Sequence, residues 1–260
     1  MEFESIRVDA IDRVTTITLN RPQAMNSVTV AMHHELEAAF DAFAADDEQF
    51  LCVVTGAGER AFCAGTDLKE RAKVGRQPYP AHGYAGLIER FDLDKPVIAA
   101  VRGVCLGGGF EIALACDLII ASRTATFGLP EPRVGAVALG GGLHRLARQI
   151  GQKQAMGMVL GCQRVDAEAG ERLGFVNEVV DDDALEDAVA RWCAMLLEAA
   201  PLSLRASKQA ILRGLDEPSL ADALSNQGEY PAFQRWRDAE DTVEGPKAFA
   251  EKRTPVWKGR

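Results

Sequence analysis

Two glutamates beside glycine- and proline-rich turns are the clearest candidates for chemistry in this chain. Glu111 follows the run from Gly103 to Phe110, which contains three consecutive glycines, and Glu131 ends the run Gly128-Leu129-Pro130-Glu131 twenty positions later. Consecutive glycines let a backbone turn approach a ligand closely, and the first N–H groups of a following helix can bind an oxyanion. The combination predicts acid/base chemistry at an activated carbonyl.

Each of these features also has an ordinary structural explanation. A glycine-rich turn before a helix can be only a tight connection, and a glutamate in the first turn of a helix is favoured by the helix dipole. Pro130 and Pro132 flank Glu131, fix the backbone and remove two hydrogen-bond donors. The residues alone therefore leave both the catalytic and the structural reading of Glu111 and Glu131 open.

A second turn of small residues strengthens the catalytic reading. The β-branched run Leu51 to Gly56 predicts a buried strand, and it leads into the segment Ala61 to Leu68, which also precedes a helical stretch. Two such turns could bring two backbone N–H donors to one oxygen, the geometry that stabilises an enolate or a tetrahedral oxyanion.

Taken in order, these motifs resemble the enoyl-CoA hydratase/isomerase (crotonase) superfamily. The matching segments cover essentially the whole chain: Leu19-Asn20-Arg21-Pro22 with Asn26, Phe62 to Lys69, Pro96 to Val101, Gly107 to Glu111, Ala115-Cys116-Asp117, Ala125 to Glu131, Gly141-Gly142 before Arg145-Leu146, and Glu244-Gly245-Pro246 with Phe249 to Arg253. Each motif is weak alone, but their common order makes a chance match very improbable.

The resemblance implies an α/β fold, with a crotonase-like ββα spiral core and a C-terminal helical subdomain. We place the core with its CoA-thioester site at residues 1–195 and the helical subdomain at 196–260. Members of this superfamily usually form trimers or dimers of trimers, so the helical subdomain is the predicted oligomerisation region. The implied partner is an acyl-CoA thioester, whose coenzyme A belongs to the substrate, and no permanently bound cofactor is implied.

The resemblance also assigns roles to individual residues. The backbone N–H groups of Ala64 and Gly108 would form the oxyanion hole for the thioester carbonyl. Glu111 and Glu131 match two catalytic glutamates, of which one activates water at Cβ and the other exchanges a proton at Cα. The positions that match the CoA and acyl-thioester site are Gln23, Ala24, Met25, Cys63, Gly65, Thr66, Asp67, Leu68, Gly107 and Pro130.

The presence of both glutamates favours an enoyl-CoA hydratase over an isomerase. Moving one proton between carbons needs chiefly the Glu131 position, whereas adding water needs one group for the water and another for the proton. Arg102 stands where the superfamily often has Asn, and residues 136–139 replace a proline-containing loop. Because Leu129-Pro130-Glu131 is similar to carnitinyl-CoA dehydratases, a specialised dehydratase stays open as an alternative.

Composition fits a globular enzyme. The chain has 260 residues and a net charge of −9, which disfavours nucleic acid as a partner because such binding needs a dense basic surface. No apolar run reaches the roughly 18 residues of a membrane span, and the N-terminus lacks the pattern of a signal peptide. We therefore expect a cytoplasmic protein that binds neither nucleic acid nor membrane.

Metal and disulfide sites are not expected. The six cysteines form no CxxC pair and have mostly apolar neighbours, which is typical of reduced core thiols. His33 and His34 fit the surface of an amphipathic helix, while His82 and His144 lack ligand-spaced partners in the sequence. We therefore predict no metal.

Other protein classes fit the motifs less well. A dinucleotide-binding dehydrogenase would need GxGxxG spacing, and a serine hydrolase would need GxSxG. A non-catalytic scaffold or RNA-binding member of the same fold is disfavoured by the two glutamates and the negative charge.

Hydrophobic periodicity predicts the elements that position these residues. We expect strands at 3–9, 13–19, 51–55, 97–101, 117–122 and 175–180, helices at 30–45, 82–93, 109–116, 140–150 and 152–160, and a nearly all-helical chain after residue 183. Residues 71–86, which include Gly75, Pro78, Pro80 and Gly83, are the expected mobile segment.

Overall fold

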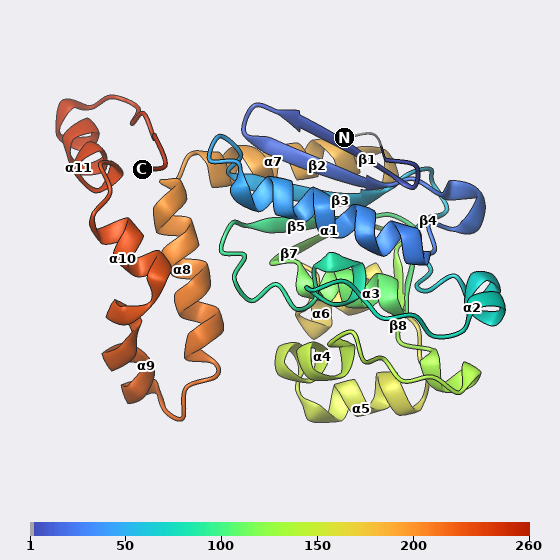
Figure 1. Ribbon diagram of the computed structural model, residues 1–260. Coiled ribbons are helices and arrows are strands. Elements are labelled where there is room, and N and C mark those ends of the chain that lie inside the picture. Colours follow the sequence, from blue (N-terminus) through green and yellow to red (C-terminus); the bar gives the residue numbers. More distant parts are fainter. Residues whose placement is uncertain (1–2) are drawn as a thin grey trace.

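The computed structural model describes residues 3–260 and contains two sheets (Figure 1). The larger sheet has six strands in the order β1-β2-β3-β5-β7-β10. Their bounds are β1 (Ile6–Ile11), β2 (Val14–Leu19), β3 (Leu51–Gly56), β5 (Val97–Val101), β7 (Leu118–Ser122) and β10 (Glu178–Val180). β1 and β2 form an antiparallel hairpin, and the other neighbours are parallel.

The central parallel strands are apolar because both of their faces are covered. On β3, Cys52 and Val54 point into the main core, while Leu51 and Val53 point to a second cluster beneath α7 (Leu185–Leu197). Successive side chains of a strand point to opposite faces, so this alternation places one helical layer on each side of the sheet.

The smaller sheet has four short strands in the order β4-β6-β8-β9. They are β4 (Ala61–Cys63), β6 (Val104–Leu106), β8 (Thr126–Gly128) and β9 (Val165–Asp166). β4, β6 and β8 are parallel to one another, and β9 is antiparallel to β8. Three loops that follow neighbouring parallel strands therefore leave the sheet at one edge.

Helices surround the sheets. α1 (Val30–Ala45) begins at Thr29, whose side chain accepts a hydrogen bond from Met32 N–H, and it buries one apolar face against the core. Next come α2 (Leu68–Val74), α3 (Gly108–Ala115), α4 (Gly142–Ile150), α5 (Gln152–Leu160) and α6 (Ala167–Leu173). α3 is buried along nearly its whole length, as its apolar sequence requires.

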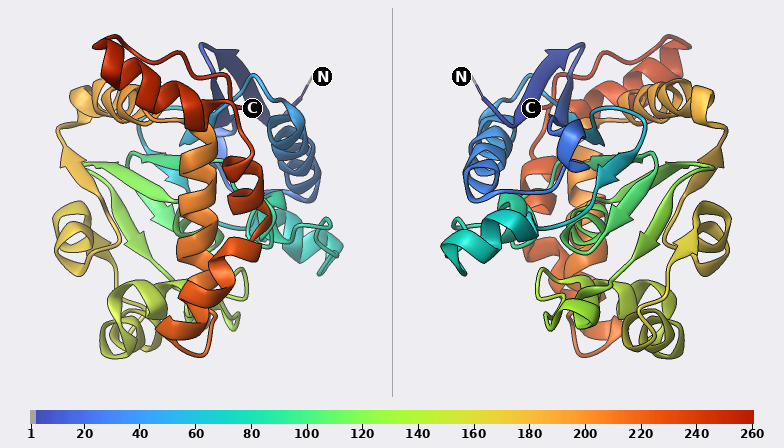
Figure 2. Two further views of the ribbon diagram at one scale, coloured as in Figure 1. Left: turned by 90° about the vertical axis from the view of Figure 1, so that its left-hand side faces the viewer. Right: turned by 90° about the vertical axis from the view of Figure 1, so that its right-hand side faces the viewer.

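The last helices form a group beside the core (Figures 1 and 2). They are α8 (Pro201–Gly214), α9 (Leu220–Asn226), α10 (Pro231–Arg237) and α11 (Asp241–Glu251). Asp94, which is buried, holds this group by accepting hydrogen bonds from Arg205, at 2.7 Å, and from Arg235. Among residues 3–260, no helix combines the length and the apolar content that a membrane span requires.

All six cysteines are free thiols, and five of them are buried. Burial raises the pKa of Cys63 to about 12 and that of Cys193 to about 11. These thiols act as small apolar side chains in the two core clusters, as the sequence predicted.

Most expected elements are confirmed, with shifts of a few residues at their ends. The helix expected at 82–93 is wrong, because only a short 3₁₀ turn, η2 (Tyr84–Gly86), forms there. Gly83, Ala85 and Gly86 all have positive φ angles, which end a right-handed helix. The short strands β4, β6, β8 and β9 were missed, since strands of two or three residues carry no readable periodicity. The proposed division at residue 195 falls in the last turn of α7.

Candidate active site

The predicted functional segments meet because their strands are neighbours. The segment after β4 carries Gly65 and Thr66, the turn after β6 carries Gly107 and Gly108, and the loop after β8 leads to Glu131. In parallel sheets, ligand sites form outside the carboxyl ends of the strands. Figure 1 shows β4, β8 and α3 together in this region.

The turn from β6 into α3 requires glycine at each position. Gly107 has a φ angle of 57°, and its N–H donates to the Gly128 carbonyl at 2.9 Å, which ties the turn to the loop after β8. A Cβ at Gly109 would lie only 2.2 Å from the Cys63 carbonyl oxygen, so the start of α3 packs directly on the end of β4. The turn therefore leaves the first N–H groups of α3 without partners inside the helix.

Glu111 lies in the first turn of α3 and is almost fully buried. Its Oε1 accepts a hydrogen bond from Gly142 N–H at 2.9 Å, and a Cβ at Gly140 would lie 2.5 Å from its Oε2. Burial raises the pKa of Glu111 to about 7; the Gly142 hydrogen bond opposes the shift and the nearby Glu131 adds to it. A carboxyl group with this pKa can both give and take a proton near neutral pH.

Glu131 begins η3 (Glu131–Val134), directly after Pro130. Its Oε1 would lie 3.2 Å from a Cβ at Gly107, so its carboxyl group sits beside the glycine turn. Its Oε2 is buried and has no hydrogen-bond partner among residues 3–260, and burial raises the pKa of this carboxyl as well. A buried acceptor left without a partner is costly for folding and marks a candidate functional atom.

The oxyanion-hole prediction requires one correction. Ala64 N–H donates to the Met25 carbonyl at 3.0 Å, so this amide is already engaged and cannot serve as a free donor. Thr66 forms a parallel bridge with Val28, in which the bonds run from Val28 N–H to Gly65 and from Asp67 N–H to Val28. The N–H of Thr66 takes no part in that bridge and has no acceptor among residues 3–260. Thr66, two positions after Ala64, therefore provides the unpaired backbone N–H donor of this turn among residues 3–260.

Gly108 N–H lies at the start of α3, close to that segment. A Cβ at Gly65 would be 3.0 Å from the Gly108 nitrogen, so the two turns are in contact. The geometry brings the N–H groups of Thr66 and Gly108 to the same edge of the small sheet.

The segment matched to the CoA site has largely structural contacts in this protein. Asn26 is fully buried and donates to the Ala57 and Ala61 carbonyls at 3.0 and 2.8 Å, which fastens η1 (Pro22–Ala24) to β4. Asp67 caps α2 and pairs with Arg21 at 3.0 Å. The remaining matched positions differ in burial: Gln23 and Leu68 are exposed, Ala24, Met25 and Pro130 are half-buried, and Cys63 and Gly65 are buried.

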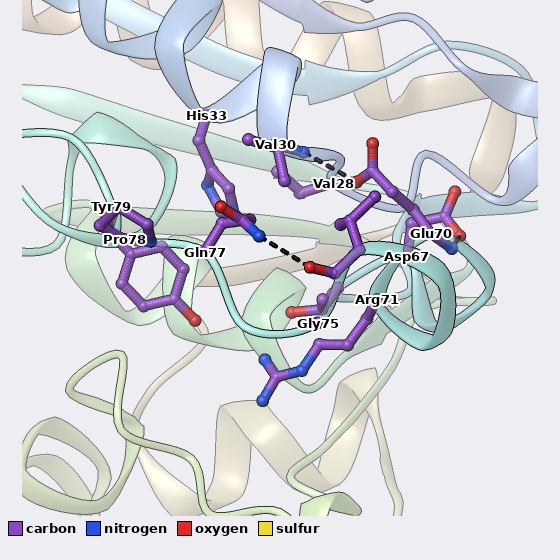
Figure 3. Close-up of a pocket in the computed structure, with 12 residues that line it drawn as sticks. Val28, Val30, His33, Asp67, Glu70, Arg71, Gly75, Gln77, Pro78 and Tyr79 are labelled. Carbon is purple, nitrogen blue, oxygen red and sulfur yellow. Dashed lines mark hydrogen bonds between the residues drawn. The ribbon is translucent and has the colours of Figure 1, made fainter.

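Sequence reasoning missed Tyr84, which is buried between the two turns. A pocket adjoins it, and His33, Thr66, Arg71 and Tyr79 are among its lining residues (Figure 3). The rings of His33, Tyr79 and Tyr84 contact one another edge to face. The flanking glycines in His82-Gly83-Tyr84-Ala85-Gly86 were the available signal of a special turn.

A group of potential metal ligands lies outside this site. Glu37, Asp41 and His82 place ligand atoms within 4.8 Å of one another, although His82 had shown no partner in the sequence. His82 Nδ1 is 2.7 Å from Glu37 Oε1, and Arg90 donates to Asp41 at 2.6 Å. Because the Arg90 guanidinium pairs with both carboxylates, the group is an ion-pair cluster of the scaffold.

Comparison with protein families and curated proteins decides the affiliation. The model of the family described as enoyl-CoA hydratase/isomerase matches residues 10–260. The chain belongs to the enoyl-CoA hydratase/isomerase family. It is similar to carnitinyl-CoA dehydratases from Proteus mirabilis and Citrobacter koseri, each 40% identical over 99% of both chains.

Solved structures of the family have the same fold. An enoyl-CoA hydratase from Mycobacterium marinum is 39% identical, with a TM-score of 0.91 over 98% of this chain and 99% of that one. One from Bacillus anthracis is 34% identical, with a TM-score of 0.89 over 99% and 100%. The predicted α/β crotonase fold is confirmed, with two mixed sheets and C-terminal helices. At the level of the family, the chain is a crotonase-type acyl-CoA hydro-lyase.

Proposed function

We propose that this protein adds water reversibly across the α,β double bond of a 2-enoyl-CoA thioester. The observation that carries the proposal is the position of the buried Glu111 and the half-buried Glu131 beside the N–H groups of Thr66 and Gly108, which have no acceptor among residues 3–260, at one edge of the small sheet. The reaction involves no net redox change, so it needs no cofactor beyond the coenzyme A of the substrate.

The N–H groups of Thr66 and Gly108 hold the thioester oxygen in this proposal. When water attacks Cβ, negative charge moves onto that oxygen and an enolate forms. Each preorganised donor aimed at such an oxyanion is typically worth about 2.7–4 kcal/mol. The donors are fixed by the fold, because Gly108 starts a buried helix and Thr66 is bridged to Val28.

The two glutamates divide the proton transfers. Glu111, oriented by Gly142 N–H, takes a proton from the water that attacks Cβ. Glu131, beside Gly107 and therefore next to the carbonyl, gives a proton to Cα of the enolate. Dehydration runs through the same steps in reverse. Two neighbouring carboxyl groups in a buried site favour a state in which they share one proton, which is the state that this scheme requires.

A second candidate is dehydration of a carnitinyl-CoA thioester. It is favoured by the 40% identity to carnitinyl-CoA dehydratases over 99% of both chains. The chemistry at Cα and Cβ is the same, so the two candidates differ only in the acyl group that the site accepts.

A direct assay with two substrates tests the proposal. We expect purified protein to remove the ultraviolet absorbance of the conjugated thioester from crotonyl-CoA. Carnitinyl-CoA is assayed in parallel for the reverse reaction, and the ratio of kcat/KM values assigns the acyl group. A protein that binds both thioesters but turns over neither would refute the hydro-lyase assignment.

A separate experiment tests the remaining proposal about assembly. Sedimentation of the active protein measures whether it forms the predicted homotrimer or dimer of trimers. A fully active monomer would contradict the proposed assembly.

A further inference from the structure

Tyr84 stands out because its hydroxyl group touches both turns of the proposed oxyanion hole. A Cβ at Gly108 would lie 2.3 Å from both Cζ and Oη of Tyr84, so the tip of the ring packs directly on this glycine. The same Oη lies 3.4 Å from Thr66 Oγ1. Tyr84 is 2% exposed, and this long contact is the one hydrogen bond of its hydroxyl within residues 3–260.

The backbone holds this hydroxyl in place at a conformational cost. Ala85 has a φ angle of 57°, a left-handed conformation that is unfavourable for a residue with a Cβ. Its N–H donates to His33 Nδ1 at 2.9 Å, and burial lowers the pKa of His33 to about 4, so the imidazole is a neutral acceptor. Strained residues of this kind persist where the surrounding structure fixes them, and they gather at functional sites.

A purely structural role does not explain the hydroxyl group. Phenylalanine would fill the same volume between His33, Tyr79 and Gly108 without burying an oxygen. A buried hydroxyl with one long hydrogen bond destabilises the folded protein relative to an apolar ring. Burial also raises the pKa of Tyr84, so the phenol keeps its proton and can donate it in a hydrogen bond.

We propose that Tyr84 Oη–H is a third donor to the thioester oxygen, added to the N–H groups of Thr66 and Gly108. This inference deepens the proposed function and rests on it. Thr66 Oγ1–H donates to Tyr84 Oη, so the proton of the phenol itself is available for the oxyanion when the enolate forms. No covalent step is involved, because the phenol donates a hydrogen bond and keeps its proton.

Tyr84→Phe tests the inference, with Tyr230→Phe as the matched control, because Tyr230 is also a buried tyrosine but lies outside the candidate site, at the start of α10. Its hydroxyl donates to Glu217 at 3.0 Å, so the control also loses a tyrosine hydrogen bond. We expect Tyr84→Phe to lower kcat for crotonyl-CoA hydration roughly 10²-fold, as for loss of one oxyanion donor, with KM little changed. Tyr230→Phe keeps the wild-type kcat. Thermal unfolding of both variants checks that each protein stays folded without the tyrosine hydroxyl group.

A spectroscopic probe separates this role from shaping of the acyl pocket. A dimethylaminocinnamoyl-CoA thioester absorbs at longer wavelength when its carbonyl is polarised. We expect wild-type protein to shift this absorption and Tyr84→Phe to shift it less. Wild-type kcat and an unreduced shift in the variant would overturn the inference, and so would a loss confined to KM with an unreduced shift.

The probe also distinguishes failure of this inference from failure of the proposed function. If wild-type protein shifts the probe but hydrates no enoyl thioester, the proposed reaction is wrong while Tyr84 is still tested by the spectrum. If wild-type protein neither shifts the probe nor hydrates a thioester, both proposals fail.

Discussion

The two carboxyl groups of the site have opposite environments. Glu111, on α3, accepts a hydrogen bond from Gly142 and is enclosed by Gly140, whereas Glu131, on η3, has a buried oxygen without a partner among residues 3–260. The protein holds the Glu111 carboxyl group in place with a hydrogen bond, whereas the unpaired oxygen of Glu131 is available to a bound ligand. In the proposed function, Glu111 therefore orients a water molecule from a fixed position, while Glu131 acts on the substrate.

The largest effect is expected from removing each acid function while keeping its shape. Glu111→Gln and Glu131→Gln should each lower kcat for hydration by about 10²–10⁴, the usual range for general acid/base catalysis. Circular dichroism shows whether each variant is folded. If one variant has the wild-type rate, the role proposed for that residue is wrong.

A slightly smaller effect is expected from displacing the backbone N–H of Gly108, one of the proposed oxyanion donors. In Gly108→Val, the new Cβ meets the Tyr84 ring at 2.3 Å and shifts the N–H that holds the thioester oxygen. We expect a loss of about 10²–10³ in kcat. Gly228→Val is the control, because a Cβ there meets nothing within 4 Å. A folded Gly108→Val enzyme with normal kcat would remove the oxyanion role from this residue.

The pH dependence of kcat/KM tests the raised pKa of Glu111. Its pKa is raised to about 7 by burial, so below this pH the group is protonated and cannot accept a proton from water. We expect kcat/KM for hydration to fall about tenfold per pH unit below about 7. Absence of this acid limb in the wild-type profile would contradict the assignment of Glu111 as the base.

The pH dependence of the free energy of unfolding tests the burial of Glu111 independently. A raised pKa means that the protonated form stabilises the fold at low pH, and that this contribution is lost as pH rises from 4.5 through about 7. Glu111→Gln removes this loss, so the variant should be more stable than wild type at pH 8 by about 3 kcal/mol. Urea unfolding at pH 8 measures the difference, and a variant of unchanged stability would contradict the burial argument.

The last effect concerns His33, on α1, which accepts a hydrogen bond from Ala85 N–H. The pKa of His33 is lowered to about 4, so wild-type protein should lose stability as pH falls from 6.5 towards 4, because the unfolded chain takes up a proton that the folded chain refuses. His33→Gln removes this part of the pH dependence, and the exposed His34→Gln keeps it. Identical pH profiles of unfolding for the two variants would contradict this account.

The structure brings together those predicted site residues that follow regular patterns in the sequence. Glu111 and Glu131 stand beside glycine and proline turns, and Gly108 opens a run that is visibly a buried helix. Ala64 was assigned by resemblance, and only the hydrogen bond to Met25 reveals that its N–H is engaged.

Tyr84 shows why the remaining part of the site could not be predicted. Its segment has the apolar spacing of a helix, but left-handed φ angles at Gly83, Ala85 and Gly86 break it. These angles depend on contacts with α1, including the bond from Ala85 to His33, which lies 52 positions away in the sequence. Such long-range support has no local signature. The short strands β4, β6 and β8 were missed for the same reason, since pairing with each other rather than periodicity defines them.

The five buried thiols can report which parts of the folded structure open to solvent, and in what order. The thiolate form of a cysteine is the nucleophile that attacks a thiol reagent, and burial raises the pKa of Cys63 to about 12 and of Cys193 to about 11. Modification therefore waits until the surrounding structure opens. Cys63 ends β4 beside the candidate site and Cys193 is a buried residue of α7. Mass spectrometry of the order of labelling would therefore time the exposure of the smaller sheet against that of α7.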